Sequence, residues 1–575
     1  MLSFNELKKN YGKKTKSNTF PVKIALLTDS STQLLGQAIT GFGVFNECDY
    51  ALWQADYNQI DLQIYDNNSV LYKFKPDYII VLRSSEHLLN TFYKTAVDER
   101  KNFAAVEING FENLVQTISA NTTCKIITNT YPEINDAVFG NYATKVAASF
   151  IYQVRKLNLS IMDLAQQHEN LLLIDMASLV AEKGYCHSFD SKLYVAADMV
   201  YNVEILPAIA QNIHSIIQAA ESRFKKCLIV DLDNTLWGGV IGDDGLDGIQ
   251  IGNLGIGKAF SEFQLWIKEL KQRGIIIAVC SKNTEAVAKE PFEKHPDMEL
   301  RLDDIALFVA NWENKADNIK HIQQILQIGF DSMVFLDDNI FEREMVRKAI
   351  PEITIPNLPE DPVDYLMYLR TLNLFETASF INEDEGRTKQ YQEEAKRVVF
   401  QKTFEAESDF LKNLEMVSEI SSFNSFSIPR IAQLCQRSNQ FNLRTQRYTE
   451  TELKQLTENN DYFTLSFSLA DKFGNHGLIA AIILKKENKN TLFIDNWIMS
   501  CRVLTRGMEQ FSLHAITELA CKNKFSMLKG EYLPTTKNGL VKDHYLKLGF
   551  NYIEGFWQMN LNVSNIINQT YIQPK

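Results

Sequence analysis

Two aspartates, one residue apart, stand at the end of an apolar stretch, and their type and spacing suit phosphoryl transfer. Asp231 and Asp233 come after the apolar residues 227–230. If those residues form a strand, the backbone turns at its end and both carboxylates can converge on one cation. A carboxylate that attacks phosphorus needs a metal to mask its charge and a second carboxyl group to protonate the leaving oxygen. Asp231 and Asp233 fit those two roles.

The other parts of such an apparatus follow in order along the chain. Ser281 can donate a hydrogen bond to a phosphoryl oxygen, and Lys315 can offset the charge of the pentacoordinate state. Asp337 and Asp338 supply the hard oxygen ligands that Mg²⁺ prefers, and we expect all four aspartates to be metal ligands. An isolated pair of aspartates is usually only a turn motif. Four such motifs in order along the chain favour a phosphoryl-transfer site instead.

These residues need a scaffold that brings them together, and a parallel α/β sheet provides one. Segments of helical period separate four predicted strands at 227–230, 275–280, 306–309 and 333–336. The carboxyl ends of parallel strands lie at one edge of the sheet, where open α/β sheets bind their ligands. The intervals from Asp231 to Ser281 and from Ser281 to Asp337 are too short for a large cap domain. We therefore expect an open site.

Further modules lie on either side of this unit. Three apolar stretches that end in polar residues predict a parallel α/β domain near the N-terminus: 22–27, 78–82 and 171–174. The charged residues 383–402 predict a connecting helix. Beyond it, helices alternate with strands at 462–469, 477–484 and 491–498. The expected domains are 1–205, 222–370 and 409–575, with a linker helix in 371–408.

The bulk composition speaks against several classes of protein. A chain of 575 residues is too long for one hydrophobic core. Its net charge of -12 gives no support for nucleic-acid binding, which usually leaves a basic footprint. No stretch approaches the roughly 20 apolar residues that span a bilayer, so we expect a cytoplasmic protein without membrane insertion. The eight cysteines form no CxxC pair, which indicates reduced thiols.

The phosphoryl-transfer residues resemble the four motifs of the haloacid-dehalogenase (HAD) superfamily. DLDNT matches the first motif, and Ser281, Lys315 and the later Asp pair match the other three. This resemblance implies that Asp231 forms an aspartyl-phosphate and that Asp233 is the acid and base. The longer stretches DLDNTLWGGVIGDDG, CSKN, NWENKADNI and FLDDNIFERE are similar to the FkbH-like subgroup, and the similarity covers nearly the whole chain.

The FkbH-like resemblance implies both a fold class and an activity. The fold would be α/β multidomain, with an SGNH-like parallel α/β domain, a capless Rossmann-like HAD domain and a GNAT-like α+β domain. The best-understood members are glyceryltransferase/phosphatases, which take the glyceryl unit of 1,3-bisphosphoglycerate, remove phosphate and load an acyl carrier protein. Mg²⁺, a small phosphorylated substrate and the phosphopantetheine arm of the carrier are therefore the expected cofactors and partners.

The N-terminal module departs from the SGNH hydrolase pattern. Thr28-Asp29-Ser30-Ser31 stands in place of Gly-Asp-Ser, and no Asp-x-x-His pair occurs near Asp175. We expect a binding domain that hydrolyses no ester. In this interpretation Ser30 caps the helix that follows the first strand.

The C-terminal module resembles GNAT acyltransferases at residues 538–550, which match that family's closing helix and strand. Arg502, Arg506 and Gly507 stand where the family presents backbone N–H groups to a pyrophosphate. Thr505 replaces a glycine of that loop, so the ligand can be CoA or, in the same cleft, a pantetheine arm.

Two cysteines and one histidine have positions that suit acyl transfer. Cys501 precedes two arginines, whose charge favours a thiolate, and Cys280 stands beside Ser281. The alternative for Cys280 is the last core residue of its strand, because free cysteines are usually buried. His476 reads either as a general base or as part of a tight turn.

The leading hypothesis is an enzyme that dephosphorylates a small acyl phosphate or phosphoester and passes an acyl group to a carrier thiol. The first alternative is a plain small-molecule phosphatase whose outer domains only bind. The second is a non-enzymatic scaffold that docks a carrier protein, and the complete set of motifs counts against it.

Overall fold

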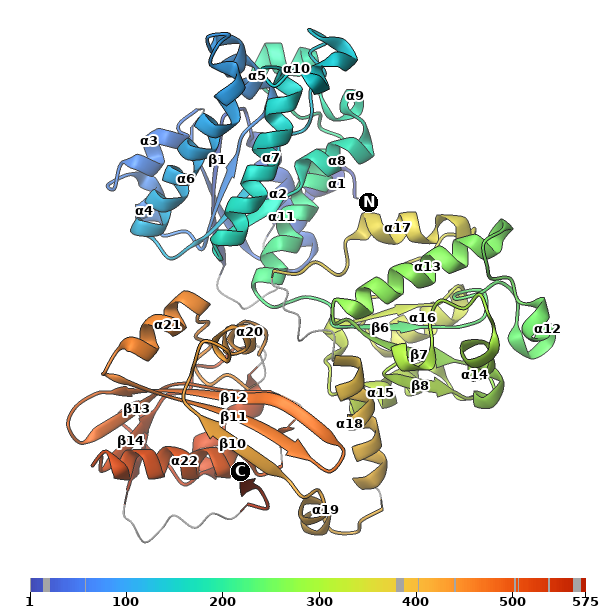
Figure 1. Ribbon diagram of the computed structural model, residues 1–575, viewed down its shortest axis with the longest axis vertical. Coiled ribbons are helices and arrows are strands. Elements are labelled where there is room, and N and C mark those ends of the chain that lie inside the picture. Colours follow the sequence, from blue (N-terminus) through green and yellow to red (C-terminus); the bar gives the residue numbers. More distant parts are fainter. Residues whose placement is uncertain are drawn as a thin grey trace. The chain divides into compact units, whose positions relative to one another are not determined.

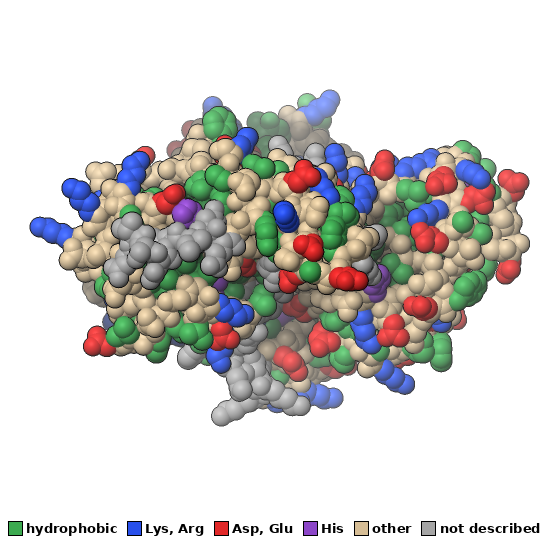
Figure 2. Space-filling model, turned by 90° about the horizontal axis from the view of Figure 1, so that it is seen from below, with side chains coloured by type: hydrophobic (Ala, Val, Ile, Leu, Met, Phe, Trp, Pro, Cys, Tyr) green, Lys and Arg blue, Asp and Glu red, His purple; other side chains and the backbone are tan. Residues whose placement is uncertain are grey.

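The computed structural model describes residues 2–13, 21–56, 58–378, 387–401, 403–438, 441–500, 503–504, 506–535, 538–561 and 570–575. The chain forms two compact units, Met1–Gln218 and Ala219–Lys575 (Figure 1). Within the described ranges, no helix is long and apolar enough to cross a membrane. On the face drawn in Figure 2, acidic and basic side chains are interspersed.

The first unit is built on a parallel sheet with the strand order β2-β1-β3-β4-β5. Its strands are β1 (Val22–Thr28), β2 (Tyr50–Gln54), β3 (Tyr78–Leu82), β4 (Lys125–Asn129) and β5 (Leu171–Ile174). Its longer helices are α2 (Gln33–Phe45), α5 (Ser85–Lys94), α6 (Phe103–Asn121), α7 (Phe150–Gln167) and α11 (Leu206–Ala220). The sequence predicted β1, β3 and β5 but missed β2, an edge strand with mostly half-buried side chains, and β4, which begins with Lys and ends with Asn.

One detail of the first strand differs from the prediction. Helix α2 begins at Gln33, and its N-cap residue is Thr32, whose side chain makes no capping hydrogen bond. Ser30 is therefore not the helix cap, because two further residues separate it from the helix. Its side chain is buried beside the end of β1.

The second unit contains a four-stranded sheet in which all neighbours are parallel, in the order β8-β7-β6-β9. The strands are β6 (Cys227–Val230), β7 (Ile276–Ser281), β8 (Leu307–Ala310) and β9 (Met333–Leu336). Both faces of the sheet are covered, since Leu228 and Val230 belong to one core cluster and Cys227 and Ile229 to another. Continuous burial explains why these strands read as uninterrupted apolar runs.

The helices of this sheet divide between its two faces. The first core cluster includes side chains of α13 (Gly255–Gln272), α14 (Glu285–Lys294) and α17 (Tyr365–Leu372). The second includes side chains of α15 (Lys315–Leu326) and α16 (Ile340–Ala349). Between β6 and β7 the chain forms only α13 and the short α12 (Ile241–Gly248), so the described residues 231–281 contain no cap domain.

The C-terminal part of the second unit is an eight-stranded mixed sheet in the order β15-β16-β14-β13-β12-β11-β10-β17. The strands are β10 (Val417–Ser421), β11 (Tyr462–Asp471), β12 (Gly474–Lys486), β13 (Thr491–Met499), β14 (Met527–Gly530), β15 (Asn551–Ile553), β16 (Phe556–Asn560) and β17 (Gln573–Pro574). Helix α22 (Met508–Lys522) packs on one face, and α20 (Ile428–Arg437) and α21 (Glu450–Glu458) pack on the other (Figure 1). The predicted class, a multidomain α/β protein with parallel sheets and a C-terminal α+β part, is confirmed.

Helix α18 (Arg387–Gln401) joins the two sheets of the second unit. Gln392 donates a hydrogen bond to the carbonyl of Ile305 at 2.9 Å, next to β8. Arg397, which is fully buried, holds Asp471 at the end of β11 through two hydrogen bonds of 2.6 and 2.8 Å. Part of the predicted helix, 383–386 and 402, lies outside the described residues. The domain limits drawn from the sequence stay predictions.

Candidate active site

The residues that the sequence singled out lie at the carboxyl edge of the four-stranded sheet. Asp231 follows β6 directly, and Asp337 and Asp338 follow the neighbouring strand β9. Ser281 is the last residue of β7, on the other side of β6, and Lys315 is the first residue of the helix after β8. Parallel pairing of the four strands therefore brings together residues that are up to about a hundred positions apart in the chain.

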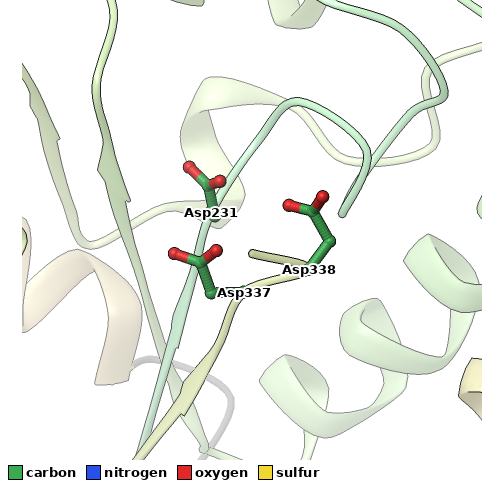
Figure 3. Close-up of side chains that lie close together, drawn as sticks. All are labelled: Asp231, Asp337 and Asp338. Atoms are coloured by element: carbon green, nitrogen blue, oxygen red, sulfur yellow. The ribbon is translucent and has the colours of Figure 1, made fainter. Parts of the chain in front are cut away.

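Three carboxyl groups form the centre of the site. Single oxygens of Asp231, Asp337 and Asp338 all lie within 4.8 Å of one another, as Figure 3 illustrates. Asp337 is completely buried, and Asp231 is 6% exposed. Burial, together with the charge of Asp231, raises the pKa of Asp337 and of Asp338 above the ordinary carboxyl range. Three carboxylates this close together are electrostatically unfavourable without a cation.

Lys315 supplies one positive charge. Its Nζ lies 2.9 Å from Asp231 Oδ2 and 2.6 Å from Asp337 Oδ2, so the ammonium group bridges the ends of β6 and β9. Burial alone would lower the pKa of Lys315, but the two carboxylates raise it above the ordinary value. The lysine is therefore charged when it faces a ligand.

Arg343 and Thr235 hold the turn that carries Asp337 and Asp338. Arg343 Nη1 donates to the carbonyl oxygens of Asp337 at 2.6 Å and of Asp338 at 2.8 Å. The backbone N–H of Asp338 donates to Thr235 Oγ1 at 3.2 Å. Neither role was predicted, although Thr235 lies in DLDNT and Arg343 in FLDDNIFERE. A guanidinium that donates to two backbone carbonyl oxygens produces no recognisable pattern in the sequence.

Asp233 does not join the carboxylate group, which is a correction to its predicted role as a metal ligand through its side chain. Its Oδ1 accepts hydrogen bonds from Trp237 Nε1 at 2.9 Å and from the backbone N–H of Ile241 at 3.0 Å. Its Oδ2 accepts one from Asn283 Nδ2 at 3.2 Å. These three donors hold the carboxyl group in place outside the group formed by Asp231, Asp337 and Asp338. Burial raises the pKa of Asp233.

Cys280 is next to Ser281 in the sequence, but its side chain points into the core. Its side chain is fully buried in the core cluster between β7 and α15. Burial raises the pKa of the Cys280 thiol, which disfavours a reactive thiolate. The geometry is that of a core residue, the alternative that the sequence left open.

The structure describes only some of the candidate residues of the C-terminal module. Cys501, Arg502 and Thr505 lie outside the described residues. Gly507 has a φ of 83° and stands before the first turn of α22. Together with Arg506 it lines a cavity of about 510 Å³.

Arg506 and His476 belong to a buried charged cluster, which we define as Glu394, Arg397, Asp471, His476 and Arg506. Arg506 Nη2 lies 2.5 Å from Glu394 Oε1, on helix α18. His476 Nε2 lies 3.3 Å from Asp471 Oδ2. His476 belongs to strand β12 and not to a turn before it. Burial lowers the pKa of His476, which favours the neutral imidazole. Arg506 therefore forms an ion pair in the buried cluster and also lines the cavity.

One protein family and several solved structures are similar to parts of this chain. The family described as FkbH, N-terminal domain, matches residues 23–218. The N-terminal part of a Bacteroides fragilis protein, described as containing a phosphatase domain complexed with Mg, is 51% identical. That match covers 66% of this chain and 100% of the other, with a TM-score of 0.63.

The acetyltransferase-like matches are more distant. The ribosomal-protein-S18-alanine N-acetyltransferase of Escherichia coli is 16% identical over 26% of this chain and 97% of that one, with a TM-score of 0.20. The spermidine N-acetyltransferase of Vibrio cholerae is 14% identical over 26% of this chain and 96% of that one, also with a TM-score of 0.20. No curated protein matches the chain.

The fold and the site define a HAD-type domain, because a parallel sheet places two Asp motifs on adjacent strands with a lysine bridging them. The family follows from the matched N-terminal domain and the 51% identity to the whole Bacteroides segment. The chain belongs to the FkbH-like family, as its motifs predicted. The finer SGNH-like description of the N-terminal domain stays a prediction.

Proposed function

We propose that this protein is a Mg²⁺-dependent phosphatase with Asp231 as its nucleophile. The observation that carries the proposal is the convergence of Asp231, Asp337 and Asp338, with Lys315 bridging two of them. The phosphatase domain of the Bacteroides relative, which is complexed with Mg, supports the choice of metal.

The residues at the site fit a magnesium ion. Asp231 Oδ1 is buried and has no hydrogen-bond partner among the described residues, so a cation would satisfy it. The three neighbouring groups are all carboxylates, the hard oxygen donors that Mg²⁺ prefers. When bound, the ion would mask the charge of the attacking carboxylate and of the phosphoryl oxygens. Asp231, Asp337 and Asp338 would hold it.

The chain's own residues account for both half-reactions. An oxygen of Asp231 forms a bond to phosphorus while the bond between phosphorus and the leaving oxygen breaks, and Asp233 donates its proton to that oxygen. Asp233 then accepts a proton from water, whose oxygen attacks the aspartyl-phosphate. Phosphate leaves and Asp231 is restored. Lys315 and Ser281 contact the phosphoryl oxygens throughout.

We further propose that the protein loads an acyl unit onto an acyl carrier protein, with 1,3-bisphosphoglycerate as donor. The family resemblance supports this step, and the cavity of about 510 Å³ beside α22 has the volume of a small-ligand pocket. Attack on phosphorus by Asp231 cannot retain an acyl group. Loading requires a thiol sulfur to attack the acyl carbon, so that the bond from carbon to the phosphate oxygen breaks and phosphate leaves.

Intact-protein mass spectrometry after incubation with 1,3-bisphosphoglycerate, Mg²⁺ and a carrier protein tests both proposals. Carrier that gains a glyceryl unit without the ester phosphate supports the complete scheme, because the thiol step alone would leave that phosphate on the acyl unit. Free phosphate without acylated carrier supports the plain phosphatase, in which the outer domains only bind. No change in carrier or phosphate favours the scaffold and overturns the enzyme. Asp231→Asn is the matched control, because it preserves the size of the side chain and removes the nucleophile.

A further inference from the structure

The carboxyl group of Asp233 is held by donors from three separate segments. Trp237 Nε1 reaches it from the loop after β6, the N–H of Ile241 from the first turn of α12, and Asn283 Nδ2 from the loop after β7. Asn283 lies fifty positions further along the chain. Pairing of β6 with β7 brings Asn283 to the carboxyl group that Trp237 and Ile241 reach from nearby in the chain.

The hydrogen bonds decide which oxygen can carry a proton. A carboxyl oxygen has two lone-pair positions. Both positions of Asp233 Oδ1 are taken, by Trp237 Nε1 and by the N–H of Ile241. Oδ2 accepts a single bond, from Asn283, and keeps one position open. The open hydrogen-bonding position of the Asp233 carboxyl group therefore lies on Oδ2.

Trp237 is a rigid donor. Its side chain is fully buried, and its ring packs edge-on against Phe292 with 5.9 Å between centroids. A side chain locked by core packing transmits its position to the group it hydrogen-bonds. Asn283 is equally constrained, because it is buried and its Oδ1 accepts the N–H of Thr284 at 2.9 Å.

We propose that Trp237 and Asn283 are positioning residues that aim the Asp233 carboxyl group at the leaving oxygen of a phosphoester. The inference rests on the proposed phosphatase function. In the step concerned, the bond from phosphorus to the ester oxygen breaks, the electron pair stays on that oxygen, and the oxygen takes the proton from Asp233 Oδ2. An alkoxide needs this proton to leave, whereas a nitrophenolate is stable without it.

Leaving-group dependence separates positioning from a merely structural role. We would measure kcat and KM for p-nitrophenyl phosphate and for glycerol 3-phosphate with wild type, Trp237→Phe and Asn283→Ala. Each variant is expected to lose roughly 10- to 100-fold in kcat on glycerol 3-phosphate, since misplacement by about 1 Å can cost that much. The loss on p-nitrophenyl phosphate should stay below about 3-fold, and KM should change little for either ester.

Two controls frame the result. Asp233→Asn should show the same selective loss in larger measure. Trp266→Phe alters a half-buried tryptophan of the same domain that packs against Phe375, and it should leave both activities unchanged. Equal losses on both esters in Trp237→Phe and Asn283→Ala, or no loss in either, would overturn the positioning role. A wild type that hydrolyses neither ester would refute the phosphatase itself, which is a distinguishable outcome.

Discussion

Replacing Lys315 by Met should destabilise the metal-free sheet edge, because it removes the buried charge between two carboxylates. The ammonium group lies 2.9 Å from Asp231 and 2.6 Å from Asp337, and all three side chains are less than one tenth exposed. Removing one partner of a buried ion pair typically costs about 3–5 kcal/mol. Added Mg²⁺ should recover part of this loss, since it binds the folded site preferentially.

Local hydrogen exchange measures this effect better than global unfolding, because a multidomain chain does not unfold in two states. A loss of about 3 kcal/mol corresponds to more than 100-fold faster exchange in β6 and β9 of the metal-free variant. Lys320→Met is the matched control on the same helix. Lys320 pairs with Asp317 at 3.0 Å on the surface, where an ion pair contributes about 1 kcal/mol or less.

The reasoning about Lys315 fails if exchange in β6 and β9 is as slow in Lys315→Met as in wild type without metal. It also fails if Lys320→Met accelerates exchange to the same extent. A variant whose exchange is fast but insensitive to Mg²⁺ would show that the three carboxylates do not bind the ion.

Four further outcomes are expected. Asp231→Asn should fold normally yet lose phosphatase activity, as should wild type after removal of Mg²⁺ with EDTA; wild-type turnover of p-nitrophenyl phosphate in either case contradicts the assignment. The N-terminal domain should hydrolyse no ester, so p-nitrophenyl acetate cleavage that disappears in Ser30→Ala would disprove the prediction. Cys501→Ala should abolish carrier acylation while sparing phosphate release, and normal loading by both this variant and Cys280→Ala would require direct transfer to the carrier thiol. Asp471→Asn should lower the free energy of unfolding of the C-terminal part by about 3 kcal/mol, because the buried cluster loses the carboxylate that accepts two hydrogen bonds from Arg397, and an unchanged melting profile by calorimetry would contradict it.

Strands buried on both faces could be predicted from the sequence. The strands β6 and β9 were located at the observed limits, because each is a short run of fully buried side chains. Strands whose side chains are mostly exposed were missed. In β10 four of five side chains are not buried, so the segment VSEIS shows no apolar run. Such strands form because a neighbour offers hydrogen-bond partners, which single-sequence patterns do not record.

The active-site residues divide in the same way. Those whose chemical type matters, such as Asp231 and Lys315, were identified from their order along the chain. The hydrogen-bond partners of Asp233 were not identified, and its carboxyl group was predicted to bind the metal as well as to act as acid and base. Its position depends on Trp237, four residues along the same loop, and on Asn283, which reaches it from the loop after β7. Long-range side-chain hydrogen bonds of this kind are set by the folded geometry and not by local spacing.

The charges gathered at the sheet edge impose an order on binding. Asp231, Asp337 and Asp338 carry three negative charges when ionised, and Lys315 and Arg343 carry two positive ones. The site without metal is therefore net negative and repels a phosphate dianion. A divalent cation reverses the sign, and the same site then attracts the dianion. We therefore expect metal to bind before substrate and to stay on the protein when phosphate leaves.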